Sequence, residues 1–146
     1  IGGCEMLSFE AVKDEFNSLG VEFTECDYNG DKVIITYFHL KKTQVGVEIA
    51  IRFEEDASIC NIYVIELAKV EYESKQYYQM LKLCNKFNIN TNYVQMYIKD
   101  DGTVWAQITL DMTKFNADEL RLSIMIILNM LDSQYISEIM KIRWDS

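Results

Sequence analysis

Proline is absent from this chain of 146 residues, histidine occurs once, and glycine occurs six times. A proline-rich or glycine-rich linker, of the kind that separates domains in many proteins, is therefore excluded, and no low-complexity segment is present. A length of 146 residues is typical of one domain and is enough to bury a core. We therefore expect a single domain spanning residues 1–146.

Long apolar runs and basic clusters are also missing. The longest apolar run, Ile124 to Leu128, is far shorter than the roughly 20 residues that a membrane-spanning helix needs. Lys41-Lys42 is the only adjacent basic pair, and the formal net charge is −9. Because this charge repels nucleic-acid phosphates and anionic lipid surfaces, we expect no nucleic acid and no membrane among the partners. Basic or polar proteins are favoured instead.

The cysteines do not form the close pairs that zinc sites usually show. Cys4, Cys26, Cys60 and Cys84 lie far apart in the sequence, with no CxxC spacing and no histidine nearby. We therefore expect no metal site. Two interpretations stay open, namely a disulfide between two of the four, or four reduced thiols of which some pack as small apolar residues. The reduced state favours a cytoplasmic location.

The first four residues, Ile1-Gly2-Gly3-Cys4, have a faint similarity to the end of a bacterial lipoprotein signal. No apolar segment stands before them, so we expect no such signal.

Signatures of catalysis are equally scarce. His39 lies inside a predicted strand, and the chain has no Gly-x-Ser-x-Gly elbow, so a structural or surface histidine is expected. The segment Asp27 to Asp31 begins like a calcium loop, but Lys32 replaces the required glycine and Phe38 stands where the last ligand, a glutamate, belongs. A hairpin turn is the better interpretation of that segment.

Carboxylates and thiols are the remaining candidates for chemistry. The cluster Glu54-Glu55-Asp56 falls in a predicted turn, and Glu66 and Glu71 flank the end of a predicted strand, so a solvated surface explains them. A thiolate at Cys60 or Cys84 would be the other route to an enzyme. No phosphate-binding glycine loop occurs. We therefore expect no enzymatic activity and no cofactor.

The residues that are present predict an alternation of helices and antiparallel strands. Ser8 is a suitable N-cap for a helix that ends at Leu19 before Gly20. Strands are expected over Val21–Cys26, Lys32–Leu40, Val45–Phe53 and Ile59–Val70, and Asn29-Gly30 marks a tight hairpin between the first two. On the third strand, one face is formed by Val45, Val47, Ile49, Ile51 and Phe53.

The second half repeats this alternation. Ser74 caps a helix with the apolar stripe Tyr77, Met80, Leu81, Cys84 and Phe87, and a polar break follows at Asn88 to Asn92. Tyr93–Ile98 and Val104–Leu110 are the last strands. Asn116 and Glu119 form a capping box for the final helix. The order α-ββββ-α-ββ-α predicts an α+β fold, with an antiparallel sheet of about five to six strands and three helices.

The final helix is apolar on two sides. Its first stripe consists of Leu120, Ile124, Ile127, Leu128 and Leu131, and its second stripe consists of Leu122, Met125, Ile126 and Met130. The first stripe can cover the sheet. The second stripe is either an interface with another chain or is covered by residues 135–144 of the same chain. Because Asp132-Ser133-Gln134 is polar, we expect the helix to break there and to restart near Tyr135.

The segment Tyr77 to Asn88 resembles the central helix of the bacterial YbjN-type domain. The shared features are the helix ending in an Asn-x-x-Asn element, here Asn85 to Asn88, then a hairpin with an acidic-glycine turn and a final apolar helix. The resemblance extends over most of the chain but rests on packing and turn residues. It implies a fold like that of type III secretion chaperones, in a small, acidic and often dimeric domain without known catalytic residues.

Two functions follow as expectations. The first is a non-enzymatic protein-binding or chaperone-like module that forms a homodimer through the second stripe (Leu122, Met125, Ile126 and Met130) and accepts an extended client segment. The alternative is a regulatory domain that binds a small ligand in a pocket near Tyr77 and Tyr78.

Overall fold

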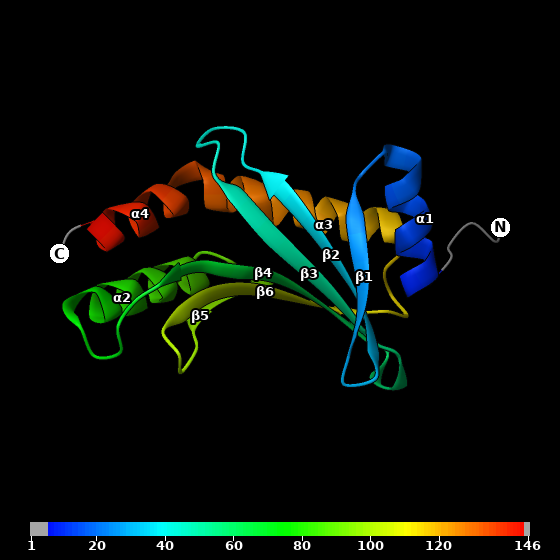
Figure 1. Cartoon of the computed structure of the whole chain (residues 1–146), viewed down its shortest axis with the longest axis horizontal. Coiled ribbons are helices and arrows are strands. Elements are labelled where there is room, and N and C mark those ends of the chain that lie inside the picture. Colours follow the sequence, from blue (N-terminus) through cyan, green and yellow to red (C-terminus); the bar gives the residue numbers. More distant parts are fainter. Residues whose placement is uncertain (1–5, 145–146) are drawn as a thin grey trace.

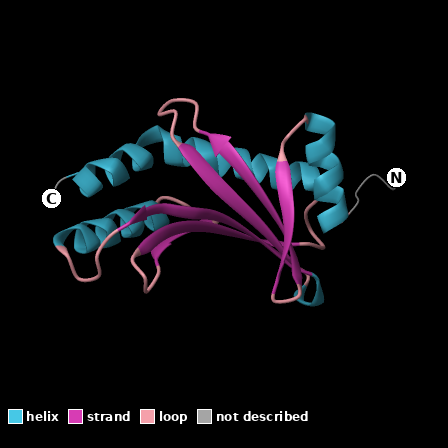
Figure 2. Cartoon of the chain, viewed as in Figure 1, coloured by secondary structure: helices cyan, strands magenta, loops and turns pink. Residues whose placement is uncertain are grey.

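Six antiparallel strands form one sheet in the order β1-β2-β3-β4-β6-β5 in the computed structural model, which describes residues 6–144 (Figure 1). The strands are β1 (Phe23–Tyr28), β2 (Asp31–His39), β3 (Gly46–Glu54), β4 (Ile59–Lys69), β5 (Val94–Ile98) and β6 (Thr103–Asp111). Figure 2 shows the strong twist of the sheet, in which β1 to β3 run across the direction of the other strands. The predicted α+β class and antiparallel sheet are confirmed.

The helices of the described chain are α1 (Phe9–Leu19), α2 (Lys75–Ile89), α3 (Ala117–Met130) and α4 (Ile136–Trp144). A short 3-10 helix, η1 (Glu55–Ala57), joins β3 to β4. The expected break near Tyr135 is wrong, because a π-helical turn, η2 (Leu131–Tyr135), carries α3 directly into α4. Figure 1 shows α3 and α4 as one long curved rod behind β2 and β3. The segment Ile1 to Cys4 lies outside the described residues.

Local capping signals place the helix ends. The hydroxyl of Ser8 accepts a hydrogen bond from the Ala11 N–H at 3.1 Å, and Gly20 ends α1 with φ +70°. At α3, Asn116 Oδ1 accepts from the Glu119 N–H at 2.8 Å while Glu119 Oε1 accepts from the Asn116 N–H at 3.0 Å. The predicted capping box is therefore present.

One apolar core joins all the helices of the described chain to a single face of the sheet. Alternate residues of the strands point into it, as the period of two requires. The fully buried strand residues Ile34, Ile49, Ile51, Ile62 and Val64 lie in register across β2, β3 and β4. We call the opposite side, which no helix of residues 6–144 covers, the open face.

Helix α2 differs from its prediction in two respects. Its buried residues are Met80, Leu83, Cys84 and Phe87, whereas Leu81 is 39% exposed. The reason is that α2 packs against both β5 and α4, which turns its buried side toward Leu83. The helix also continues through Asn88 to Ile89, so the polar break begins later than expected.

A buried carboxylate anchors the β2–β3 loop to the π-helical turn. Asp132 is 7% exposed, and its two oxygens accept hydrogen bonds from the backbone N–H groups of Lys42 at 2.6 Å and Thr43 at 3.0 Å. Burial by itself raises the pKa of Asp132, but these two donors, the Thr43 hydroxyl and the charge of Lys42 together outweigh it and hold the pKa below its usual value. The carboxylate therefore stabilises the fold while it is ionised.

Replacement of Asp132 by asparagine is expected to lower the melting temperature by several degrees at neutral pH. Both backbone N–H groups lose a charged acceptor, and one of them then faces the amide NH2 instead of an oxygen. The folded pKa lies below the unfolded value, so this contribution is present above about pH 4 and is lost as the pH falls through the folded pKa. Thermal unfolding followed by circular dichroism should show the gap to the unmodified chain closing in acid. Asp14→Asn, at an exposed position of α1, is the control and should leave no gap.

Candidate functional site

The second stripe of α3 is exposed in the structure. Leu122 is 46% exposed and Ile126 is 59% exposed, while Met125 and Met130 are half-buried. Four of the five residues of the first stripe belong to α3 and the fifth opens η2; all five are buried. Of the two alternatives, coverage of the second stripe by residues 135–144 is therefore not seen for Leu122 and Ile126. Because η2 continues α3 into α4, the segment at residues 135–144 packs Tyr135, Ile136 and Ile139 into the core instead.

A groove of about 440 Å³ lies beside the second stripe. Ile126 and Met130 form one side of it, and the loop between α2 and β5 contributes Tyr93, which is 82% exposed. Phe115, from the segment before α3, lies in the same groove. The apolar surface therefore extends from α3 onto two other segments. The sequence analysis did not identify Tyr93 or Phe115 as part of a site. For Tyr93 a signal was present, because a large aromatic residue directly follows the polar segment at residues 90–92.

The β5 edge of the sheet is closed by side chains. Asn88 Nδ2 donates to the carbonyl oxygen of Met96 at 3.0 Å, and the Met96 N–H donates to Asn88 Oδ1 at 2.7 Å. Thr91 Oγ1 donates to the carbonyl oxygen of Val94 at 2.7 Å. The amide of Asn88 thus takes the place of a neighbouring strand. This assigns a role to Asn88 within the Asn85–Asn88 element.

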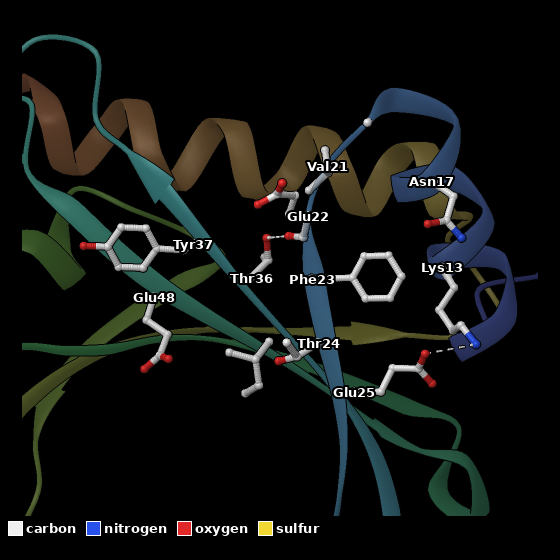
Figure 3. A pocket seen from close by; sticks show the side chains of 12 residues that line it. Lys13, Asn17, Val21, Glu22, Phe23, Thr24, Glu25, Thr36, Tyr37 and Glu48 are labelled. Atoms are coloured by element: carbon white, nitrogen blue, oxygen red, sulfur yellow. Dashed lines mark hydrogen bonds and ion pairs between the residues drawn. The ribbon is translucent and has the colours of Figure 1, made fainter.

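Among residues 6–144, no side-chain hydrogen bond of this kind caps the β1 edge, and a shallow groove of about 960 Å³ lies along it (Figure 3). Figure 3 shows Phe23 pointing from β1 toward α1, and the two rings of Phe16 and Phe23 are 5.9 Å apart. The carboxylates that line the groove are Glu22, Glu25 and Glu48. Lys13 of α1 forms an ion pair with Glu25 at 3.3 Å, so the groove carries more acid than base.

The candidates for catalysis are not brought together. His39 is exposed at the end of β2, with its ring edge-on to Tyr37 at 5.4 Å. Among the carboxylates, Glu54 accepts a hydrogen bond from Asn61. The cluster Glu54-Glu55-Asp56 precedes β4, whereas Glu66 and Glu71 lie at its other end.

The thiols also fail to suggest an active site. Cys26, Cys60 and Cys84 are free, so no disulfide joins these three. Burial raises the pKa of the Cys84 thiol to about 11 and that of Cys60 further, which keeps both protonated and poorly nucleophilic. Within residues 6–144, no group of three or more His, Cys, Asp or Glu residues is placed to hold a metal ion. In that same part of the chain, no helix is long and apolar enough to cross a membrane.

The tyrosines around the start of α2 pack against one another. The ring centroids of Tyr72 and Tyr77 are 5.0 Å apart, and those of Tyr77 and Tyr78 are 5.4 Å apart. Tyr72 and Tyr78 are each more than half exposed. None of the three lines the grooves described above.

Comparison with known proteins adds no assignment: no protein-family model matches the chain, and no curated protein matches it significantly.

Proposed function

We propose that the protein is a non-enzymatic protein-binding or chaperone-like module that acts as a homodimer, and that it is related to the bacterial YbjN-type domains. The observation that carries the proposal is the exposed second stripe of α3. The element order α-ββββ-α-ββ-α agrees with what the resemblance implies. The lack of an assembled catalytic set among the described residues is consistent with it.

The homodimer would form by packing of α3 against its counterpart in a second copy. Leu122 and Ile126 are four residues apart, so they lie on one side of the helix, and the groove with Tyr93 and Phe115 continues the apolar surface. A two-fold axis across α3 would bring the same surface of both copies together. Burying these side chains gains free energy in proportion to the apolar area removed from water.

The client would bind as an extended segment along β1. With β5 capped by Asn88, β1 is the outer strand of the sheet to which a further strand could be added. The carboxylates of Glu22, Glu25 and Glu48 along the neighbouring groove favour a segment that carries lysine or arginine. The net charge of −9 would speed the encounter with such a client.

Solution mass across a concentration series tests the homodimer. Ile126→Glu is expected to weaken dimerisation by at least about a hundredfold, because it places an unpaired charge in the apolar interface. Leu81→Glu is the matched control, since it adds the same charge at an exposed apolar position of α2. It should leave the dimer intact. Circular dichroism of both variants shows whether each is folded.

The homodimer proposal fails if the unmodified chain is a monomer at every concentration. It also fails if Ile126→Glu remains folded and dimerises as strongly as the Leu81→Glu control.

A further inference from the structure

The open face contains a hollow of about 500 Å³ that is lined by residues from all six strands. Its floor is formed by Val33, Ile35 and Ala50. Ala50 of β3 lies in register between Ile35 of β2 and Tyr63 of β4, so a methyl group stands between two much larger side chains. The hollow therefore exists because one small residue sits in the middle of the sheet. Its volume is in the range of small-molecule sites.

Aromatic rings form the walls. Tyr63 and Trp105 lie edge to face, with ring centroids 5.9 Å apart and an interplanar angle of 83°. Tyr97 of β5 is the cross-strand partner of Trp105, and Tyr28 stands on the β1 side. Rings presented at these angles offer faces and edges to a planar ligand.

The hollow also contains a lysine, Lys99, that is free to bind an anion. Lys99 Nζ lies 4.0 Å from the centroid of the Trp105 ring, and no carboxylate of residues 6–144 forms an ion pair with it. Its nearest acidic neighbours in the sequence are Asp100 and Asp101. The Asp101 carboxylate accepts hydrogen bonds from Thr103, and these, together with the positive charge of Lys99, hold its pKa below the usual value.

Arg52 is the second cation at the hollow, and it differs from Lys99. Its Nη2 lies 2.7 Å from Asp31 Oδ2 and its Nε donates to the same oxygen at 2.8 Å. The guanidinium also lies over the Tyr28 ring, 4.9 Å from its centroid. Because Asp31 balances its charge, Arg52 shapes the wall of the hollow. Lys99 is a cation of the hollow without an ion-pair partner among residues 6–144, and Asp27, the carboxylate that also lines the hollow, is paired with Lys32 at 3.3 Å.

We propose that this hollow binds a small aromatic molecule with one anionic group. The ring would pack between Tyr63 and Trp105, and the anion would lie at Lys99. A nucleic acid fits less well. Its repeating phosphates would meet one cation without an ion-pair partner, on a chain of net charge −9. The proposal is independent of the homodimer and of client binding, and the site is separate from the tyrosines of α2.

Two dyes of nearly the same shape test the proposal. The probe is 8-anilinonaphthalene-1-sulfonate, an aromatic anion, and its comparison is N-phenyl-1-naphthylamine, which lacks the sulfonate. Lys99→Gln is expected to weaken binding of the sulfonate roughly five- to tenfold, as loss of one charge-assisted contact would. It should change binding of the neutral dye less than twofold. Lys82→Gln, at an exposed position of α2, is the matched control and should alter neither.

Filling the hollow provides a second test. Ala50→Phe should abolish binding of both dyes, and Ala50→Leu should weaken both while disturbing the sheet less. Ile126→Glu should leave both unchanged, since the second stripe of α3 lies on another face. Circular dichroism identifies any variant that does not fold. If both Ala50 variants are unfolded, the comparison of Lys99→Gln with the unmodified chain tests the proposal by itself.

Three results would overturn the proposal. One is equal affinity of the unmodified chain and Lys99→Gln for the sulfonate dye. Another is loss of dye binding in Ile126→Glu with retention in Ala50→Leu, which would place the dye on α3. The third is an Ala50→Leu variant that changes the solution mass and not the dye affinity, which would make the open face a contact between copies.

Discussion

Replacement of Phe87 by alanine is expected to lower the free energy of unfolding by about 3–5 kcal/mol. Phe87 is fully buried on α2, and its ring lies edge-on to that of Tyr135 with the centroids 4.8 Å apart. Tyr135 closes the π-helical turn between α3 and α4, so this contact joins α2 to the junction of α3 and α4. Alanine would leave a cavity that rigid neighbours on both sides cannot fill.

Urea denaturation of Phe87→Ala beside Leu81→Ala measures this effect. Leu81 is on the same helix but exposed, so its replacement should change the stability by less than about 0.5 kcal/mol. A loss below about 1.5 kcal/mol for Phe87→Ala would contradict the docking of α2 on the core.

Gly102→Ala is expected to cost at least twice as much stability as Gly30→Ala. Both glycines have a positive φ, +85° at Gly102 and +86° at Gly30, so each substitution carries a strain of about 1–2 kcal/mol. A Cβ at Gly30 would meet open space, whereas a Cβ at Gly102 would overlap the carbonyl oxygen of Val70. That backbone is held in place, since the Val70 N–H donates to the Gly102 carbonyl oxygen at 2.9 Å.

The comparison separates the strain of the dihedral angle from the close approach of two backbone segments. Thermal and urea unfolding of the two variants, side by side, measure it. Equal losses would mean that the segment after β4 moves aside at little cost, and the close approach would then have no role in stability.

Elements set by local chemistry could be predicted well from the sequence. The hydroxyl of Ser8 and the left-handed conformation of Gly20 determine the ends of α1 from neighbouring residues alone. Asn29 and Gly30 both have positive φ, as a two-residue hairpin turn requires, and β1 and β2 pair directly on either side of them. The first stripe of α3 was predicted from spacing and is buried.

Features set by distant contacts could not be predicted. The choice of Leu83 over Leu81 on α2 depends on where β5 and α4 lie. The continuous rod of α3 and α4 depends on Asp132, whose polarity indicated a break. In the structure that polarity is satisfied by backbone N–H groups about 90 residues earlier in the chain, at Lys42 and Thr43.

The candidate sites also depend on contacts between residues that are far apart in the sequence. Exposure of Leu122 and Ile126 was one of two alternatives, and the sequence could not decide between them because the course of residues 131–144 was not known. The hollow of the open face was missed. Its walls come from strands widely separated in the sequence, and Ala50 is informative only once Ile35 and Tyr63 are known to flank it.

The cap that Asn88 places on β5 has a consequence for polymerisation. A sheet with two bare edges can join copies head to tail without limit, as in a filament. Here Asn88 and Thr91 form hydrogen bonds with the backbone of Met96 and Val94, which leaves β1 as the outer strand without such a cap among residues 6–144. A client segment added to β1 would occupy this remaining edge, so growth of the sheet from copy to copy would stop there.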